Sequence, residues 1–308
     1  MIKLFTHTDL DGIGCTILAK LAFGENIDIC YCDYGNINEE VEKLMRKKET
    51  ISECHITDIS IKEELAEKIN HNINTKNIQL LDHHPTALDL NKYSWCMVKI
   101  QNDFTKIKTS GTELYYNWLI SHGYLKNNDA LLTFVQTVRD YDTWRWAELG
   151  ENGIICKQLN DLFGILGRDE FISWSMKKIR EKAFPELSET DLLLLKLTQR
   201  EIDEYIKGKE QTMLPRKISG YNAGVIFADK YVSEMGNNLC KKHPELDFIM
   251  IIDMDGKISY RTIQDDINLG KLVADLFGGG GHPKAAGAQI KDEIRDVLVD
   301  VLLDNLMQ

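Results

Sequence analysis

A carboxylate and two imidazoles stand side by side at Asp82, His83 and His84. They directly follow Ile78–Leu81, a short apolar run that predicts a buried strand. Open α/β sheets bind ligands at the carboxyl ends of their strands, and mixed carboxylate and imidazole donors suit Mn, Fe, Co or Zn. The triplet predicts a metal centre if other strand ends supply matching donors. By itself it is equally compatible with an ordinary polar turn.

The start of the chain carries a second group of donors, His7, Asp9 and Asp11. They lie between a strand-like run, Ile2–Thr6, and residues 15–23, whose apolar positions have helical spacing. Because side chains of an extended segment repeat every second residue, this spacing predicts three ligands on one side of the chain. The alternative is an Asp-rich turn that caps a helix.

Two further carboxylates in the same half of the chain also follow predicted elements. Asp58 lies at the end of a short strand-like run, and Asp142 follows a predicted helix at about 130–138, with Asp140 as a second candidate beside it. Each alone is typical of a cap or a solvated turn. Together with the donors above they suffice for two metal ions if one carboxylate bridges them. The candidate metal ligands are His7, Asp9, Asp11, Asp58, His83 and Asp142.

The elements that must position these residues alternate between strand and helix over residues 1–155, which predicts an α/β domain with a doubly wound, mostly parallel sheet. Strand signals vanish from about residue 156, and we expect a helical connector over 156–214. Residues 215–308 return to a mixed pattern, with a hairpin turn at Asp255–Gly256. We expect a smaller α+β domain there.

Four consecutive glycines, Gly278–Gly281, precede His282 in this last part. Such a run exposes backbone N–H groups that can form an anion-binding nest, with His282 placed to contact a phosphate. A flexible linker is the alternative. It fits poorly, because the run lies between a predicted helix and a predicted strand.

Composition limits the possible partners. The chain has 308 residues with a net charge of −11, which argues against a long nucleic-acid footprint but not against a small phosphate ester at a metal centre. No apolar run is long enough to span a bilayer, and the N-terminus lacks the organisation of a signal peptide. Seven cysteines without framework spacing predict reduced thiols and a cytoplasmic protein.

The Asp82-His83-His84 triplet, the opening from His7 to Gly12 and the stretch from Gly278 to Gly287 resemble the DHH/DHHA1 phosphoesterase superfamily over nearly the whole chain. The stretches 6–12 and 141–144 resemble most the NrnB-type oligoribonucleases (nano-RNases), a group often described together with cAMP/cGMP phosphodiesterases. The resemblance implies a DHH catalytic domain at 1–155 and a DHHA1 substrate-binding domain at 215–308. It also implies a 3′–5′ exonuclease that degrades short RNA to 5′-mononucleotides with water activated by two divalent ions. Mn²⁺ is the first choice, with Mg²⁺ or Co²⁺ as alternatives.

The resemblance also implies individual roles. One metal would take His7, Asp9 and Asp58, and the other Asp11, Asp58, His83 and Asp142, so that Asp58 bridges. Asp82 would orient the histidines, and His84 would face the phosphate of the substrate. A phosphate would be held in the second domain by Arg261, Gly279, Gly280, Gly281 and His282, with His282 also neutralising charge during catalysis. The chain departs from several branches of the superfamily, in which the first His stands four residues before the first Asp instead of two.

Several alternatives share these residues. The same site would serve a cyclic nucleotide or cyclic-dinucleotide phosphodiesterase, or a 3′,5′-bisphosphate nucleotidase. A pyrophosphatase or exopolyphosphatase would require a strongly basic second domain, for which the sequence gives thin support. A non-catalytic nucleotide sensor would not need two ions. The expected partners are short oligoribonucleotides or nucleotide phosphate esters, with no membrane, and the oligomeric state, monomer or homodimer, is left open.

Overall fold

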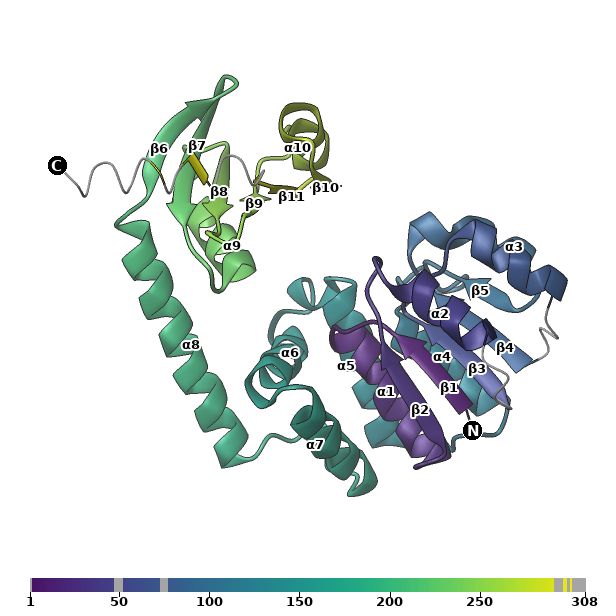
Figure 1. The fold of residues 1–308 in the computed structure, drawn as a ribbon. Helices are drawn as coiled ribbons and strands as arrows, with labels where there is room; N and C mark the ends of the chain where they lie inside the picture. The colour runs from purple at the N-terminus through teal and green to yellow at the C-terminus, as the bar shows by residue number, and fades with distance from the viewer. Residues whose placement is uncertain (1, 47–51, 73–76, 291–295, 298–299, 301–308) are drawn as a thin grey trace. The chain divides into compact units, whose positions relative to one another are not determined.

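The computed structural model of the chain describes residues 2–46, 52–72, 77–290, 296–297 and 300 (Figure 1). Contacts between Cα atoms divide the chain into two units, Met1–Lys196 and Leu197–Gln308. The domain bounds expected from the sequence, at 155/156 and 214/215, stay a prediction. Among the described residues no helix combines the length and the apolar character needed to cross a membrane.

The first unit is built on a parallel sheet of five strands. These are β1 (Ile2–Thr6), β2 (Ile27–Tyr31), β3 (Glu53–Thr57), β4 (Ile78–Asp82) and β5 (Cys96–Val98). Their order in the sheet is β2-β1-β3-β4-β5, and every pair of neighbours is parallel. The predicted α/β class with a mostly parallel sheet is therefore confirmed.

Successive residues of the central strands face opposite sides of this sheet, which gives two helical layers (Figure 1). Leu4 and Leu81 lie in the core beneath one layer, whereas Phe5 and Leu80 lie in the core beneath the other. The first layer contains α1 (Leu10–Phe23), α4 (Gly111–Ser121) and α5 (Asp129–Asp142), and the second contains α2 (Ile37–Arg46) and α3 (Glu63–Asn72). The doubly wound arrangement follows from this alternation of apolar side chains.

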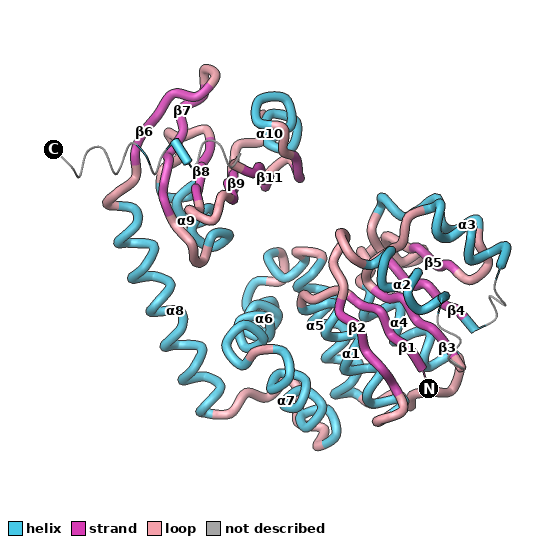
Figure 2. Tube along the Cα trace, in the orientation of Figure 1, coloured by secondary structure: helices cyan, strands magenta, loops and turns pink. Residues whose placement is uncertain are grey.

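Three more helices follow in the region expected to be a connector (Figure 2). They are α6 (Ile154–Leu166), α7 (Arg168–Arg180) and α8 (Glu189–Glu210). Leu159 of α6 and Phe171 of α7 are fully buried in the same core as α1 and α5. Helix α8 contributes Leu195 to that core, and Ile202 and Ile206 to a core of the second unit. One continuous helix thus takes part in both units.

The second unit contains a mixed sheet, as expected for an α+β domain. Its strands are β6 (Leu214–Ile218), β7 (Tyr221–Phe227), β8 (Phe248–Ile252), β9 (Lys257–Arg261), β10 (Gly280–His282) and β11 (Ala285–Gln289). Their order is β10-β11-β9-β8-β7-β6, with only the β7–β8 pair parallel among these strands. Its helices are α9 (Val232–Lys242) and α10 (Leu269–Phe277).

The glycine run, which the sequence predicts to form an anion-binding nest, joins the end of a helix to a strand. Gly278 ends helix α10 in the left-handed conformation, with a φ of 67°. Gly280 and Gly281 already belong to β10, which pairs with β11. A side chain at Gly279 would bring its Cβ within 2.0 Å of the Gly287 carbonyl oxygen. Close backbone packing therefore accounts for at least part of the run.

Candidate metal centre

The candidate site lies at the carboxyl end of β1, where the order of strands in the first sheet reverses. Because β2 lies on one side of β1 and β3 on the other, the carboxyl end of β1 is a topological switch point, where open α/β sheets bind ligands. His7 follows β1, Asp58 follows β3 and His83 follows β4, and these three strands are neighbours in the sheet. The strand order alone brings these residues to one edge.

Asp9 both caps a helix and belongs to the first donor group. Its Oδ1 accepts a hydrogen bond from the Gly12 N–H at 3.0 Å as the N-cap of α1, while its Oδ2 lies 2.8 Å from His7 Nδ1. One donor atom each from His7, Asp9 and Asp58 lie within 4.8 Å of one another, close enough to hold a metal ion. The two interpretations of this stretch, capping turn and ligand set, are therefore compatible.

The geometric reason given for that ligand set was wrong. The segment is not extended, because α1 begins at Leu10 and Asp11 already lies in its first turn. Gly12 makes this early start possible, since a Cβ there would lie 2.2 Å from the His7 carbonyl oxygen. The helix can thus begin directly against the end of β1, which turns Asp11 into the interior.

Asp11 is held by the N-terminus of α4. Its carboxylate accepts hydrogen bonds from the N–H groups of Gly111, at 2.6 Å, and Thr112, at 2.9 Å. Ser110 caps α4 by accepting a hydrogen bond from the Glu113 N–H. The sequence does not reveal the contact between this helix start and Asp11, because the two lie 100 residues apart in the chain. The start of α4 thus satisfies both oxygens of this buried side chain.

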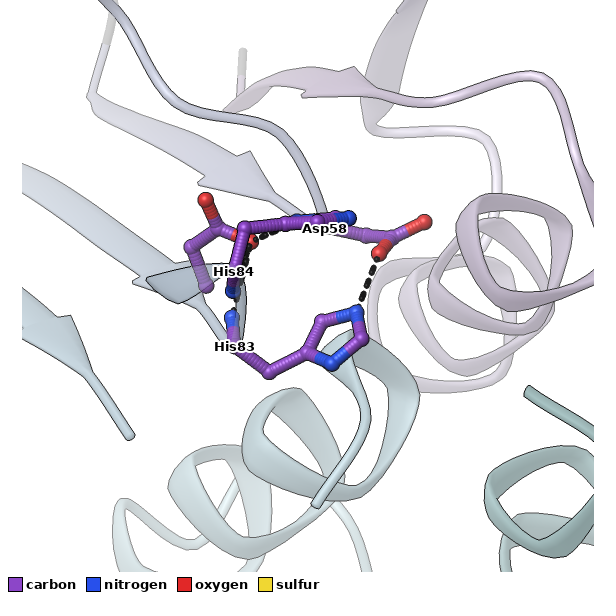
Figure 3. A group of neighbouring side chains, drawn as sticks. Asp58, His83 and His84 are labelled. Carbon is purple, nitrogen blue, oxygen red and sulfur yellow. Dashed lines mark hydrogen bonds and ion pairs between the residues drawn. The ribbon is translucent and has the colours of Figure 1, made fainter. Parts of the chain in front are cut away.

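His83 joins the first donor group to a second one. Its Nε2 lies 3.2 Å from Asp58 Oδ1 and 3.6 Å from carboxylate oxygens of Asp11 and Asp142. Figure 3 shows the His83 ring directed at the Asp58 carboxylate. Donor atoms of Asp11, His83 and Asp142 lie within 4.8 Å of one another and could hold a second ion. The structure thus brings all six predicted donors together at one edge.

Two donor atoms in this cluster lack the hydrogen bonds that buried polar atoms normally make. Asp58 Oδ2 and His83 Nε2 are both buried without a hydrogen-bond partner among the described residues. Asp58 also has a left-handed backbone with a φ of 57°, a strained conformation of the kind that clusters at functional sites. Carboxylate and imidazole atoms left open in this way fit a divalent metal ion.

The pKa values of the carboxylates in the cluster also favour a bound metal ion. Burial, together with the charges of Asp11 and Asp9, raises the pKa of Asp58 well above its ordinary value. The same causes raise the pKa of Asp142 to about 8. Crowded carboxylates disfavour one another's charged forms. A cation bound among them would supply the missing positive charge.

Asp82 has a different role from the other carboxylates. It is fully buried, and its Oδ1 accepts hydrogen bonds from the His83 N–H, at 2.8 Å, and from the His84 ring Nδ1, at 2.7 Å. Its Oδ2 accepts from the Ser60 hydroxyl. Asp82 thus fixes the direction of the His84 ring, and it also belongs to a third group of possible metal donors, with Asp58, His83 and His84. Burial lowers the pKa of His84, but the hydrogen bond and the charge of Asp82 outweigh burial and raise that pKa above its ordinary value.

Tyr34 is a residue at the site that the sequence analysis missed. Its hydroxyl lies 3.1 Å from His84 Nε2, and its ring centroid lies 5.5 Å from that of His7. His84 is therefore held from both ring nitrogens, by Asp82 and by Tyr34. The available signal was the position of Tyr34 just after β2, in a turn at the carboxyl edge of the sheet.

Asp140, the alternative to Asp142, belongs to a network of ion pairs. It contacts Arg139 at 2.8 Å and Arg145 at 2.9 Å, and Arg139 also contacts Glu113 at 2.8 Å. Its charge is therefore balanced within the protein. Asp142, at the last position of α5, lies in the donor cluster instead.

The predicted phosphate-binding residues lie in the second unit and form a group of their own. Arg261 at the end of β9 and His282 at the end of β10 both stand opposite Ala285 of β11 in the sheet register. Arg261 Nη2 donates to the Ser233 hydroxyl at 3.0 Å, which fixes the guanidinium. His282 is exposed. Gly279, Gly280 and Gly281 immediately precede it.

We expect Asp58→Asn to remove binding of both metal ions, because it keeps the shape of the side chain while taking the charge from the point where the two donor groups meet. Asp140→Asn is the matched control. It should retain both ions but lose stability on the order of 3 kcal/mol, because it leaves Arg139 and Arg145 without their shared partner. Calorimetric titration with Mn²⁺ measures the stoichiometry. Retention of one full equivalent by Asp58→Asn would show that Asp58 is not shared.

The metal-free protein should lose stability as the pH rises from about 4 to about 8. An unfolded aspartate titrates near pH ~3.9, whereas folding raises the pKa of Asp142 to about 8. Between these values the folded state binds a proton that the unfolded state has lost, so the free energy of unfolding falls with rising pH. Asp142→Asn should flatten this slope in denaturant titrations with a chelator present. An unchanged slope would contradict the assignment.

The chain is similar to known proteins over most of its length. The family model of the DHHA1 domain matches residues 217–307. The chain is 38% identical over 307 residues to oligoribonuclease NrnB of Bacillus subtilis (strain 168), which covers 97% of this chain and 75% of that protein. It is 26% identical over 328 residues to a 3′,5′-cyclic-nucleotide phosphodiesterase of Helicobacter pylori, covering 92% and 91% of the two chains.

A solved structure shares the fold across both units. The crystal structure of exonuclease RecJ bound to manganese matches with a TM-score of 0.59 and 13% identity, covering 96% of this chain and 87% of that one. At this identity the likeness shows the fold alone. The match to NrnB, by contrast, is strong enough and long enough to establish kinship. The chain belongs to the DHH/DHHA1 phosphoesterase superfamily, in the family of oligoribonuclease NrnB.

Proposed function

We propose that this protein is a metal-dependent 3′–5′ exonuclease that hydrolyses short oligoribonucleotides to 5′-mononucleotides. The observation that carries the proposal is the pair of donor groups that meet at Asp58 and His83. Kinship with an oligoribonuclease supports the substrate class. The net charge of −11 agrees with a short substrate, because a long nucleic acid requires a broad basic surface.

In this proposal the two donor groups hold two divalent ions, with Mn²⁺ as first choice. His7, Asp9 and Asp58 would hold one ion. The other would be held by Asp11, His83 and Asp142, with Asp58 shared. Two ions bound here would supply an activated water molecule and neutralise charge on the phosphate during in-line displacement. This division uses every donor atom that the structure leaves open in the cluster.

The other residues at this edge would position the phosphate. Asp82 accepts from Nδ1 of His84 and favours the protonated ring. A protonated His84 can donate a hydrogen bond from Nε2 to a phosphate oxygen, in place of its contact with Tyr34. Asp82 and His84 would thus act as a pair, with the buried carboxylate fixing the direction of the ring.

The second unit would bind another phosphate of the substrate. Arg261 and His282 occupy positions opposite the same residue of β11, so their side chains leave the sheet on the same side. Gly279, Gly280 and Gly281 would allow close approach of the backbone. We propose residues 215–308 as the substrate-binding domain on this basis, with residues 1–155 as the catalytic domain.

Hydrolysis of a cyclic nucleotide is the second candidate function. It is favoured by the similarity to the Helicobacter pylori phosphodiesterase, which extends over 92% of this chain. The same donor groups would serve both reactions, because each breaks one phosphodiester bond. Only the substrate profile separates them.

The test is Mn²⁺-dependent hydrolysis of a diribonucleotide, a pentaribonucleotide, a long RNA, 3′,5′-cAMP and pyrophosphate, measured side by side. We expect the two short RNAs to be preferred, with 5′-mononucleotides as products and no activity in excess chelator. Asp58→Asn is the matched inactive control. Preference for cAMP would replace the main proposal with the second candidate, and hydrolysis of pyrophosphate alone would overturn both.

A further inference from the structure

A pocket of about 320 Å³ opens beside the candidate metal centre, within the first unit. It reaches His84 at one end, and Tyr34 forms one of its walls. Its floor is apolar, because Ile61, Ala87 and Leu90 line it while being at most 6% exposed. A pocket of this size, with an apolar floor and an aromatic wall, fits a flat, partly apolar ligand.

The rim of the pocket is polar. Asn38 accepts a hydrogen bond from the Lys62 N–H through its Oδ1, at 2.8 Å, which fixes the amide and leaves its NH₂ group as a donor. Thr86 lines the pocket with an exposed side chain. Polar groups placed around an apolar floor can recognise the hydrogen-bonding edge of a ligand.

The charges of the residues that line the pocket indicate whether it suits the phosphate or the base of a nucleotide. Glu63, Asp82 and Asp89 contribute carboxylates, whereas Lys62 and His84 contribute the cations. This balance disfavours a phosphate inside the pocket and tolerates a neutral group. Aromatic side chains stack on nucleic-acid bases of any sequence, and the Tyr34 ring is 57% exposed.

We propose that this pocket binds a nucleobase of the substrate, stacked against Tyr34, while the adjoining phosphate lies at His84. The proposal rests on the proposed function and adds a subsite to it. The stacking contact with Tyr34 would accept any base, whereas Asn38 and Thr86 would contact the base edge. Tyr34 would also lie near the phosphate, since its hydroxyl contacts His84 before the phosphate takes its place.

Thr86→Trp fills the pocket from its exposed rim. Leu88→Trp is the matched control, because Leu88 is 42% exposed on the same 3₁₀ helix, Pro85–Lys92, and lies outside the lining. Binding of AMP and of ribose 5-phosphate to the Mn²⁺-loaded proteins is measured by calorimetry. The wild type and Leu88→Trp should bind AMP at least tenfold more tightly than ribose 5-phosphate. Thr86→Trp should bind the two equally.

A second pair of variants tests the stacking wall. Tyr34→Phe keeps the ring and loses the contact with His84, so the preference for AMP should remain. Tyr34→Leu should reduce it. Equal binding of AMP and ribose 5-phosphate by the wild type, or an unchanged preference in Thr86→Trp, would overturn the subsite.

Kinetics on a diribonucleotide test the base subsite and the oligoribonuclease activity separately. Thr86→Trp should raise KM about tenfold for the diribonucleotide, and leave it unchanged for an analogue that lacks the base bound in the pocket. Hydrolysis of the diribonucleotide and of the analogue without the base with the same KM would overturn the subsite alone. If the protein binds AMP more tightly than ribose 5-phosphate, loses this difference in Thr86→Trp and does not cleave RNA, the subsite would be supported and the oligoribonuclease activity would be overturned.

Discussion

The structure depends on a concentration of negative charge at a buried sheet edge. Asp11 and Asp58 are almost completely buried there, with Asp9 and Asp142 close by. Burying carboxylates is costly unless each is paired with a positive charge or with hydrogen-bond donors. Asp11 is stabilised by the N-terminus of α4, but one oxygen of Asp58 has no partner within the described chain. Cations bound here would balance a cluster that the described residues alone leave unbalanced.

The fold maintains this cluster through close backbone packing. Gly12 lets α1 begin against the end of β1, and Gly111 lets α4 begin against Asp58, where a Cβ would lie 2.4 Å from the Asp58 Cβ. These contacts place two helix starts at the switch point of the sheet. The same edge continues past His84 into the pocket behind Tyr34. In our proposals, the metal ligands, the phosphate contact and the base contact follow one another along this edge.

Much of this arrangement was predictable because donors at strand ends meet wherever parallel strands are neighbours. The α/β class, the run of β1 and the family followed from local patterns, and all six candidate ligands lie at one edge. Tyr34 was not predictable, because its role depends on how the turn after β2 approaches His84. Asp142 was preferred to Asp140 from the resemblance alone, because the ion pairs of Asp140 with Arg139 and Arg145 became visible only in the structure. Strand β5 was missed because three residues carry almost no periodic signal.

In the proposed metal centre, Asp58 joins two metal ions at this edge. Anomalous diffraction at the manganese edge, from crystals grown with Mn²⁺, tests it most directly because it locates each ion independently of any activity. We expect two anomalous peaks, with the Asp58 carboxylate in contact with both ions and His83 in contact with one. A single peak, or two peaks that the Asp58 carboxylate does not both contact, would show that Asp58 is not a bridge.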